Sequence, residues 1–169
     1  MNEHSLKEAC RREMDIKIRK ARPEDMKVLT ELLIRSKRSN GYDEAFMAAC
    51  REELTVTEDH LADGEYWVAE SGVVCGCACL TADPNGRSGE IHTFFIDPDW
   101  QRQGIGRLLW KKLLERAKER RLERLHLDAD PAAAPFYGAL GFEVAGESPS
   151  GSIAGRTLPH MTLVLDRAD

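Results

Sequence analysis

Two glycines lie two positions apart in the segment WQRQGIGRLLW, residues 100–110, where a strand-like apolar run gives way to a basic helical pattern. The first N–H groups of a helix have no acceptor within the helix, and the helix dipole is positive at that end. Gly104 and Gly106 would let an anion come close to these groups, so the turn is suited to hold a phosphate. A tight turn at a helix start is the alternative explanation. The fingerprints of dinucleotide and nucleoside triphosphate loops are missing, because there is no third glycine and no GKS or GKT.

Five cysteines form a second candidate group for chemistry. Cys75, Cys77 and Cys79 alternate with Gly76 and Ala78, which predicts that all three share one face of a strand. A zinc site would need histidines at the appropriate spacing, and these are missing. A cysteine nucleophile would need an exposed thiol of lowered pKa beside a base, and the apolar context argues against both. We therefore expect small core residues and no metal.

The helix after the glycines has the clearest pattern in the chain, because Ile105, Leu109, Leu113 and Ala117 recur every four residues opposite Arg and Lys. Strands and helices are expected around it in an order that indicates an α+β (mixed α/β) domain. The first expected strand is IKIRKA, from residue 16, and EYWVAE and VVCGCACL are expected to form a hairpin around residues 71–72. Four more strands are expected at EIHTFFI, LERLHLDAD, EVAGES and HMTLVLD. The other expected helices are residues 26–35, most of residues 43–60, and PAAAPFYGALGF.

Length and charge limit the class of protein. We expect residues 1–15 to be an N-terminal extension, a frayed helix, and residues 16–169 to form a single domain. Lys and Arg number 24 against 29 Asp and Glu, a net charge of −5, so we expect no nucleic-acid partner. Because neither a signal-peptide core nor a run of about 18 apolar residues occurs, we also expect no membrane partner and a cytoplasmic location.

Two segments together resemble one known family. EIHTFFIDPDWQRQGIGRLL is similar to motif A of the GCN5-related N-acetyltransferase (GNAT) family, in which a strand with FxIxP precedes [QR]xxGx[GA]. LDADPAAAPFYGALGF resembles the later FYxxLGF motif of that family, and the likeness extends over about Ile16 to Leu165. The resemblance implies the GNAT fold: a mostly antiparallel, twisted sheet of about six to seven strands flanked by about four helices, with a splayed strand pair forming an acyl-coenzyme A slot.

The resemblance also implies acetyl-coenzyme A as co-substrate. Its pyrophosphate would lie on the residues of the turn: Gln101, Arg102, Gln103, Gly104, Ile105, Gly106 and Arg107. Its pantetheine arm would run along the backbone of Phe94, Phe95 and Ile96, like an added strand. The family often has Asn where Asp130 stands, and that Asn forms a hydrogen bond with the pantetheine. A carboxylate accepts hydrogen bonds but does not donate them. The sequence therefore leaves open whether Asp130 makes this contact.

The reaction implied is direct attack of an amine on the thioester, without a covalent enzyme intermediate. A primary amine of pKa about 10.4 must lose a proton first. Glu90 stands at the family's base position and shares a strand face with His92, the alternative base or a water-holding partner, whereas His126 is expected to be structural. Tyr137 stands at the position whose hydroxyl reaches the coenzyme sulfur and can protonate the leaving thiolate, and the backbone N–H of Phe94 or Phe95 would stabilise the oxyanion.

The acceptor follows less directly from the sequence. We expect a primary amine of a small molecule, or less favourably a protein amino group, and a monomer or homodimer; the alternative is a non-catalytic acyl-coenzyme A sensor. Residues 146–161, GESPSGSIAGRTLPHM, are expected to form a long loop over the acceptor pocket, and a similar stretch occurs in some bacterial members of the family. In that arrangement Arg156 pairs with an acceptor carboxylate or phosphate, and His160 lines the entrance. A solvated or dimer-contacting loop is the alternative.

Overall fold

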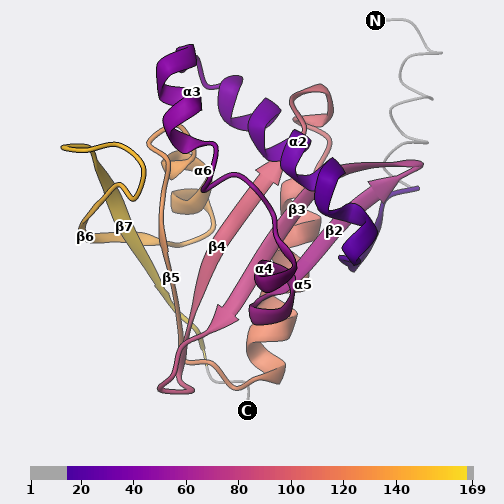
Figure 1. The fold of residues 1–169 in the computed structure, drawn as a ribbon. Helices are drawn as coiled ribbons and strands as arrows, with labels where there is room; N and C mark the ends of the chain where they lie inside the picture. Colours follow the sequence, from indigo (N-terminus) through magenta and orange to yellow (C-terminus); the bar gives the residue numbers. More distant parts are fainter. Residues whose placement is uncertain (1–14, 167–169) are drawn as a thin grey trace, which may run out of the picture.

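A computed structural model describes residues 15–166 of the chain, so the extension expected for residues 1–15 falls outside the described residues except for Asp15. Seven strands form one sheet in the order β1-β2-β3-β4-β5-β7-β6 (Figure 1). Their bounds are β1 Lys17–Lys20, β2 Glu65–Ser71, β3 Val73–Ala82, β4 Ser88–Ile96, β5 Arg124–Asp128, β6 Glu143–Pro149 and β7 Thr157–Val164. All neighbouring pairs are antiparallel except β4 and β5. The mixed, mostly antiparallel sheet expected from the sequence is confirmed.

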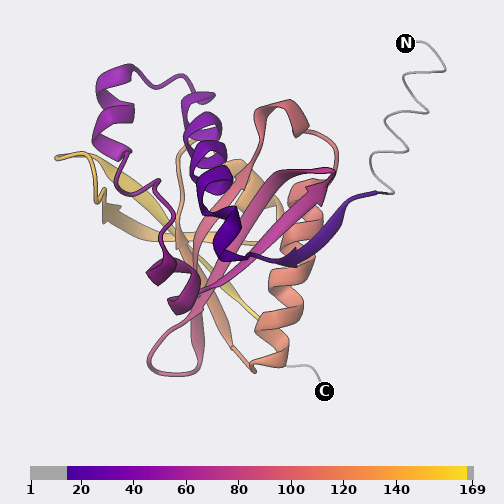
Figure 2. The ribbon, with the colours of Figure 1, turned by 45° about the vertical axis from the view of Figure 1, so that its right-hand side comes forward.

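Helices cover both faces of this sheet (Figures 1 and 2). The described residues contain five α-helices: α2 Met26–Arg38, α3 Glu44–Cys50, α4 Glu58–Asp63, α5 Ile105–Glu119 and α6 Ala134–Ala139. Short 3₁₀ turns precede α2, at Pro23–Asp25, and α5, at Pro98–Trp100. None of the helices within residues 15–166 is long and apolar enough to cross a membrane.

Two hydrophobic clusters hold the layers together. On one face the apolar stripe of α5 is buried, with Ile105, Leu109, Leu113 and Ala117 all at most 1% exposed, as the four-residue period predicts. On the other face α2 buries Leu29, Leu32 and Leu33 together with residues of α3, and the partly buried Leu61 of α4 packs against them. Full burial of a Leu side chain contributes about 2 kcal/mol, so these stripes fix α2 and α5 on opposite faces of the sheet.

The parallel pair is short, and this opens the sheet. β4 and β5 pair only from Ser88 with Arg124 to Glu90 with His126. Beyond these residues the two strands diverge, and the β5-facing edge of Ile91–Ile96 has no partner strand within residues 15–166. The splayed strand pair expected from the family resemblance is therefore present.

A β-bulge corrects one expectation. Ala69 pairs with Gly76 and Glu70 pairs with Val74, so Cys75 is an extra residue in β3. The bulge reverses the alternation, and Cys75 lies in the α5-side cluster while Cys77 and Cys79 lie in the α2-side cluster. The prediction that all three cysteines share one face is wrong for Cys75, but all three are buried as expected.

Two segments also differ from their expected secondary structure. Residues 51–57 interrupt the helix expected over most of 43–60, because Thr55, Val56 and Thr57 are β-branched and the Thr57 hydroxyl caps α4 by accepting from the His60 amide, 3.3 Å away. The expected long loop over residues 146–161 is shorter, because β6 extends to Pro149, which pairs with Thr157 of β7. Only residues 150–156 form the connection between these strands.

Candidate active site

The glycine turn has the geometry that an anion site requires. Gly104 is the N-cap of α5 with φ of 79°, a left-handed conformation that favours glycine, and Arg102 also has a positive φ of 64°. A Cβ on Gly106 would lie 3.2 Å from two ring atoms of Phe136, a tighter contact than a Cβ usually makes, so glycine favours the close packing against α6. The first amides of α5 thus open into free space at the positive end of a helix of 15 residues.

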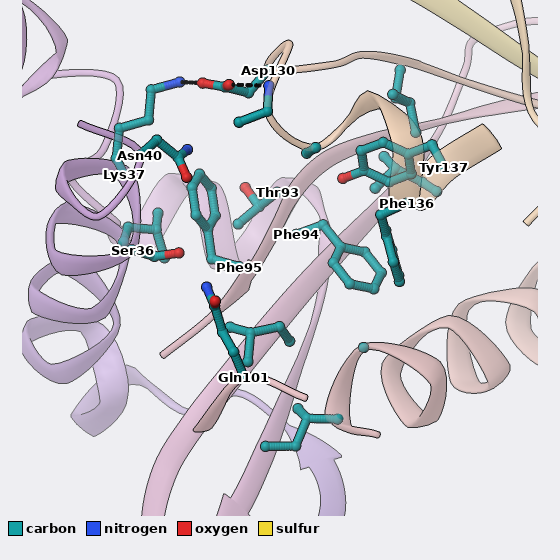
Figure 3. A pocket seen from close by; sticks show the side chains of 18 of the residues that line it. Ser36, Lys37, Asn40, Thr93, Phe94, Phe95, Gln101, Asp130, Phe136 and Tyr137 are labelled. Atoms are coloured by element: carbon teal, nitrogen blue, oxygen red, sulfur yellow. Dashed lines mark hydrogen bonds and ion pairs between the residues drawn. The ribbon is translucent and has the colours of Figure 1, made fainter. Parts of the chain in front are cut away.

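A cavity of about 550 Å³ joins this turn to the splayed strands. Its walls include every predicted coenzyme-binding residue except Gln103: Phe94, Phe95, Ile96, Gln101, Arg102, Gly104, Ile105, Gly106, Arg107, Asp130 and Tyr137. Figure 3 shows the Gln101 side chain directed toward Phe95, and Phe94 beside Phe136. The Gln103 side-chain oxygen is buried without a hydrogen-bond partner among the described residues.

Tyr137 lies on α6 at the opposite wall of this cavity, and Figure 3 shows its hydroxyl directed into the space between the strands. Aromatic contacts hold the ring, with centroids of Phe94, Phe136 and Phe142 at 6.0, 5.4 and 5.8 Å. Burial, and to a smaller extent the charge of Asp130, raises the pKa of the phenol well above its usual value. The hydroxyl therefore stays protonated near neutral pH, as a proton donor must be before the reaction begins.

His92 and Glu90 are in contact but differ in what they face. Leu80 pairs with Ile91 and Cys79 pairs with Thr93, so His92 is a bulged residue of β4. His92 lines the first cavity, and Glu90 does not. The Nδ1 atom of His92 lies 3.5 Å from Oε1 of Glu90, so a Glu90 carboxylate can orient the imidazole from behind.

A second cavity, of about 930 Å³, lies on the α3 and α4 side of the sheet. It shares Leu33, Glu53, His92 and Thr93 with the first cavity, so the two cavities adjoin at the bulge of β4. Thr93 is fixed there by a buried contact of 3.1 Å between its hydroxyl and that of Tyr66. The sequence analysis did not identify this cavity, because residues 52–64 carry no motif and meet β4 only in the fold.

Asp130 is surrounded by donors from distant parts of the chain. Lys37 Nζ lies 2.5 Å from Oδ2, the Tyr42 hydroxyl donates at 2.8 Å, and the Ala132 amide donates to Oδ1 at 2.9 Å. Burial raises the pKa of Asp130, but these hydrogen bonds and the charge of Lys37 outweigh it and hold the pKa below its usual value. Sequence reasoning missed Lys37 and Tyr42, which belong to no motif and lie 93 and 88 positions from Asp130.

The two residues predicted to meet the acceptor already have partners. Arg156 donates to the Tyr42 hydroxyl at 2.7 Å, lies 3.7 Å from Asp130, and stacks over the Phe46 ring at 4.8 Å. His160 Nδ1 lies 2.7 Å from Asp128 Oδ1. The 150–156 connection does approach the second cavity, where Gly151 and Ser152 form part of the wall. The acceptor-binding role of Arg156 and His160 stays a prediction.

His126 meets Asp83, with its Nε2 atom 2.7 Å from Oδ2, as a structural residue would. Asp83, Glu90 and His126 together offer three possible metal-ligand atoms within 4.8 Å of one another. Each side chain is partly exposed, and Asp83 is hydrogen-bonded both to His126 and to the Ser88 hydroxyl.

The three cysteines of β3 do not form a nucleophilic site. Burial raises the pKa of Cys75 to about 11 and that of Cys79 to about 12, so the thiols stay protonated and unreactive near neutral pH. Cys77 is fully buried, and burial raises its pKa further still. This geometry opposes the covalent alternative.

Three features define the class of protein: a glycine turn at a helix N-terminus, a splayed parallel strand pair, and a cavity between them. They are typical of mixed-sheet proteins in which this cavity is suited to bind an anion. The chain belongs to the Acetyltransferase (GNAT) family, whose profile matches residues 27–142. The structure of the PaiA N-acetyltransferase from Thermoplasma acidophilum in complex with coenzyme A matches this fold with a TM-score of 0.74 at 20% identity, over 89% of this chain and 99% of that one.

Curated relatives agree with this assignment. The 5-NmdU N-acetyltransferase of Pseudomonas phage PaMx11 is 30% identical over 140 residues, which is 80% of this chain and 93% of that protein. The N-acetyltransferase MJ1207 of Methanocaldococcus jannaschii is 38% identical over 74 residues, 42% of this chain, and the chain spans only 33% of its length.

Proposed function

We propose that this protein transfers the acetyl group of acetyl-coenzyme A directly to a primary amine. The observation that carries the proposal is the single cavity that joins the amides at the start of α5, the unpaired edge of β4 and the Tyr137 hydroxyl. The pyrophosphate would bind Gly104, Ile105 and Gly106 at the helix N-terminus. The coenzyme complex of the Thermoplasma relative supports a coenzyme at this place in the fold.

In this proposal, different residues along the cavity carry out separate steps of the reaction. The pantetheine arm would pair with the free edge of Phe94, Phe95 and Ile96, which brings the thioester between β4 and Tyr137. A β4 amide beside Phe94 would stabilise the oxyanion, and Tyr137 would give its proton to the departing thiolate. The phenol is protonated before each turnover, as a proton donor must be, although the raised pKa also makes it a weaker acid than an exposed tyrosine.

His92 is the base in this proposal, and Glu90 positions it. The imidazole lines both cavities, so it lies where an amine from the second cavity meets the thioester in the first. The ammonium loses one proton to His92, and the neutral amine attacks the carbonyl carbon. When the tetrahedral intermediate collapses, the carbon–sulfur bond breaks, Tyr137 protonates the sulfur, and the nitrogen gives its second proton to the Tyr137 phenolate. Glu90 would hold the imidazole through Nδ1, at 3.5 Å, and offset the charge that forms on it.

The second cavity is the proposed acceptor site, and its size suits a small molecule better than a folded protein surface. The test is coenzyme A release from acetyl-coenzyme A, followed with a thiol reagent in the presence of pools of small primary amines. Release that depends on one pool, together with an acetylated amine in the product, is the expected result. Tight coenzyme binding without release in any pool, including lysine peptides, would instead indicate a sensor.

A further inference from the structure

Thr93 is a buried polar residue at the place where the two cavities adjoin. It is 7% exposed, and it lines both cavities (Figure 3). The cavities also share Leu33, which has no polar side-chain atom, and Glu53 and His92, which are both exposed. Thr93 thus combines a polar side chain with burial at this junction, close to the unpaired edge of β4 where the thioester would lie.

The bulge of β4 explains why two consecutive residues reach the same space. In a regular strand, successive side chains point to opposite faces of the sheet. His92 and Thr93 follow one another in the chain, yet each of them lines both cavities. The register between β3 and β4 shifts between Cys79 and Leu80, and His92 is the extra residue. Bulges redirect side chains in this way, and here an imidazole and a hydroxyl come to the same place.

Tyr66 of β2 holds the Thr93 hydroxyl. Tyr66 pairs with Cys79, and Cys79 pairs with Thr93, so the three residues form one row across β2, β3 and β4. The small Cys79 side chain leaves room for the Tyr66 hydroxyl to reach the Thr93 hydroxyl, at 3.1 Å. Tyr66 is itself 7% exposed, and burial raises the pKa of its phenol to about 12. Two neutral hydroxyls therefore meet near neutral pH, and their contact favours one orientation of the Thr93 side chain.

This contact leaves Thr93 able to accept a further hydrogen bond. A threonine hydroxyl has one O–H donor and two lone pairs. If Tyr66 is the donor, the contact occupies one lone pair of Thr93 Oγ1, and if Thr93 is the donor, it occupies neither. In both cases at least one lone pair is left for a donor in the cavity.

We propose that the Thr93 hydroxyl oxygen binds the attacking amine by accepting one of its N–H groups. This inference rests on the proposed function. A primary ammonium has three N–H groups: one gives its proton to His92, one later gives its proton to the Tyr137 phenolate, and the third remains in the amide product. The third N–H donates to Thr93 and keeps the nitrogen in place during the attack, since a buried N–H without an acceptor is unfavourable. Tyr66 acts through Thr93 and is a positioning residue.

Thr93→Val tests the hydroxyl, because valine has nearly the same shape and no hydrogen-bonding group in its side chain. Butylamine, phenethylamine and a lysine peptide are assayed with saturating acetyl-coenzyme A, and the amine on which the wild type is most active is used for the variants. We expect kcat/KM for that amine to fall about tenfold or more, while the Kd of acetyl-coenzyme A changes by less than about twofold. If Thr93→Val does not fold, Thr93→Ala is measured in its place.

Thr93→Ser is the matched control, because serine keeps the hydroxyl and loses a methyl group. It should retain at least about a third of the wild-type kcat/KM for the amine. A loss of less than about twofold in Thr93→Val would overturn the proposal. So would a serine variant that is no more active than the valine variant.

Tyr66→Phe separates this role from a purely structural one. It breaks the same contact but keeps the Thr93 hydroxyl at the cavity, so kcat/KM for the amine should fall by only about two- to threefold. Thermal unfolding of Tyr66→Phe and Thr93→Val measures what the contact contributes to stability. Equal kinetic losses in the two variants would mean that the contact supports the fold and nothing more, which overturns the proposal.

The failures of the two proposals are distinguishable. If the wild type acetylates one of the three amines and Thr93→Val acetylates it equally well, the role of Thr93 fails and acetyl transfer stands. If the wild type binds acetyl-coenzyme A but none of the amines releases coenzyme A, acetyl transfer itself fails, and the role of Thr93 fails with it.

Discussion

The Nζ atom of Lys37 lies 2.5 Å from Oδ2 of Asp130, although 93 positions separate the two residues in the chain. Both side chains are 13% exposed, so the pair is largely shielded from water. It joins the last turn of α2 to the segment between β5 and α6, and Lys37 and Asp130 both line the coenzyme cavity, as Figure 3 shows. The ion pair therefore sets the spacing of the two walls at this end of the slot.

Removal of Lys37 from its ion pair with Asp130 should destabilise the folded protein. Lys37→Met leaves the Asp130 carboxylate without its closest cation, and we expect the free energy of unfolding to fall by about 2–3 kcal/mol in chemical denaturation. Arg38→Met is the control, because Arg38 pairs with Glu44 at 3.5 Å with both side chains more than half exposed, and its loss should cost less than about 1 kcal/mol. Equal effects of the two substitutions would contradict the role assigned to the buried pair.

The same pair makes stability depend on pH. Burial disfavours the charged form of Asp130, but hydrogen bonds from Lys37 and Tyr42 outweigh this and lower its pKa in the folded state. A carboxyl of lowered pKa contributes stability above its unfolded value of about 3.9 and loses that contribution as the pH falls through the folded value. The difference in unfolding free energy between wild type and Asp130→Asn should thus shrink below about pH 4. A difference that stays constant from pH 7 to pH 3 would show that the carboxylate charge contributes nothing.

Tyr137→Phe isolates the proton donor. The ring contacts with Phe94, Phe136 and Phe142 do not need the hydroxyl, so affinity for acetyl-coenzyme A should stay within about twofold while kcat falls about 100-fold or more. Calorimetry and steady-state kinetics on one preparation separate the two effects. A parallel loss of affinity and turnover would mean that the hydroxyl binds the coenzyme and does not protonate its thiolate.

His92→Asn and Glu90→Gln distinguish the base from the group that positions it. If His92 takes the proton, its substitution should lower kcat/KM for the acceptor by about 100-fold or more, whereas Glu90→Gln, which keeps the cavity wall, should lower it by roughly tenfold. The reverse order would return the base to Glu90, the position that the family resemblance implies.

The sequence predicts those parts of the site whose structure depends on residues close together in the chain. Gly104 and Gly106 follow from a turn that needs a positive φ and a close approach, and the α5 stripe follows from a period that burial enforces. The strand pair around residues 71–72 follows from its alternation and turn residues. The role of Tyr137 and the coenzyme came from the family resemblance, since an aromatic in a short helix has no functional signature of its own.

The remaining features depend on contacts that form only in the fold. Bulges at Cys75 and His92 shift the alternation of β3 and β4, and no residue type marks their positions. The partners of Asp130 come from α2 and the segment before α3, and Glu53 reaches the active site only because residues 51–57 leave the helix that their neighbours predict. The sequence places Arg156 in a loop predicted to cover the acceptor pocket. Only the fold shows that Arg156 is hydrogen-bonded to Tyr42 and stacked on Phe46.

The central claim is that the amides at the start of α5 bind the pyrophosphate of acetyl-coenzyme A, and calorimetric titration of the coenzyme into three proteins tests it most directly. Gly104→Ala and Gly104→Glu both place a side chain at φ of 79°, where an added Cβ meets nothing within 4 Å, so they share a strain cost of about 1–2 kcal/mol. Only the glutamate adds a negative charge. The account predicts that wild type and Gly104→Ala bind the coenzyme, and that Gly104→Glu shows no binding while its thermal transition matches that of Gly104→Ala. Equal affinity of the two variants would contradict it.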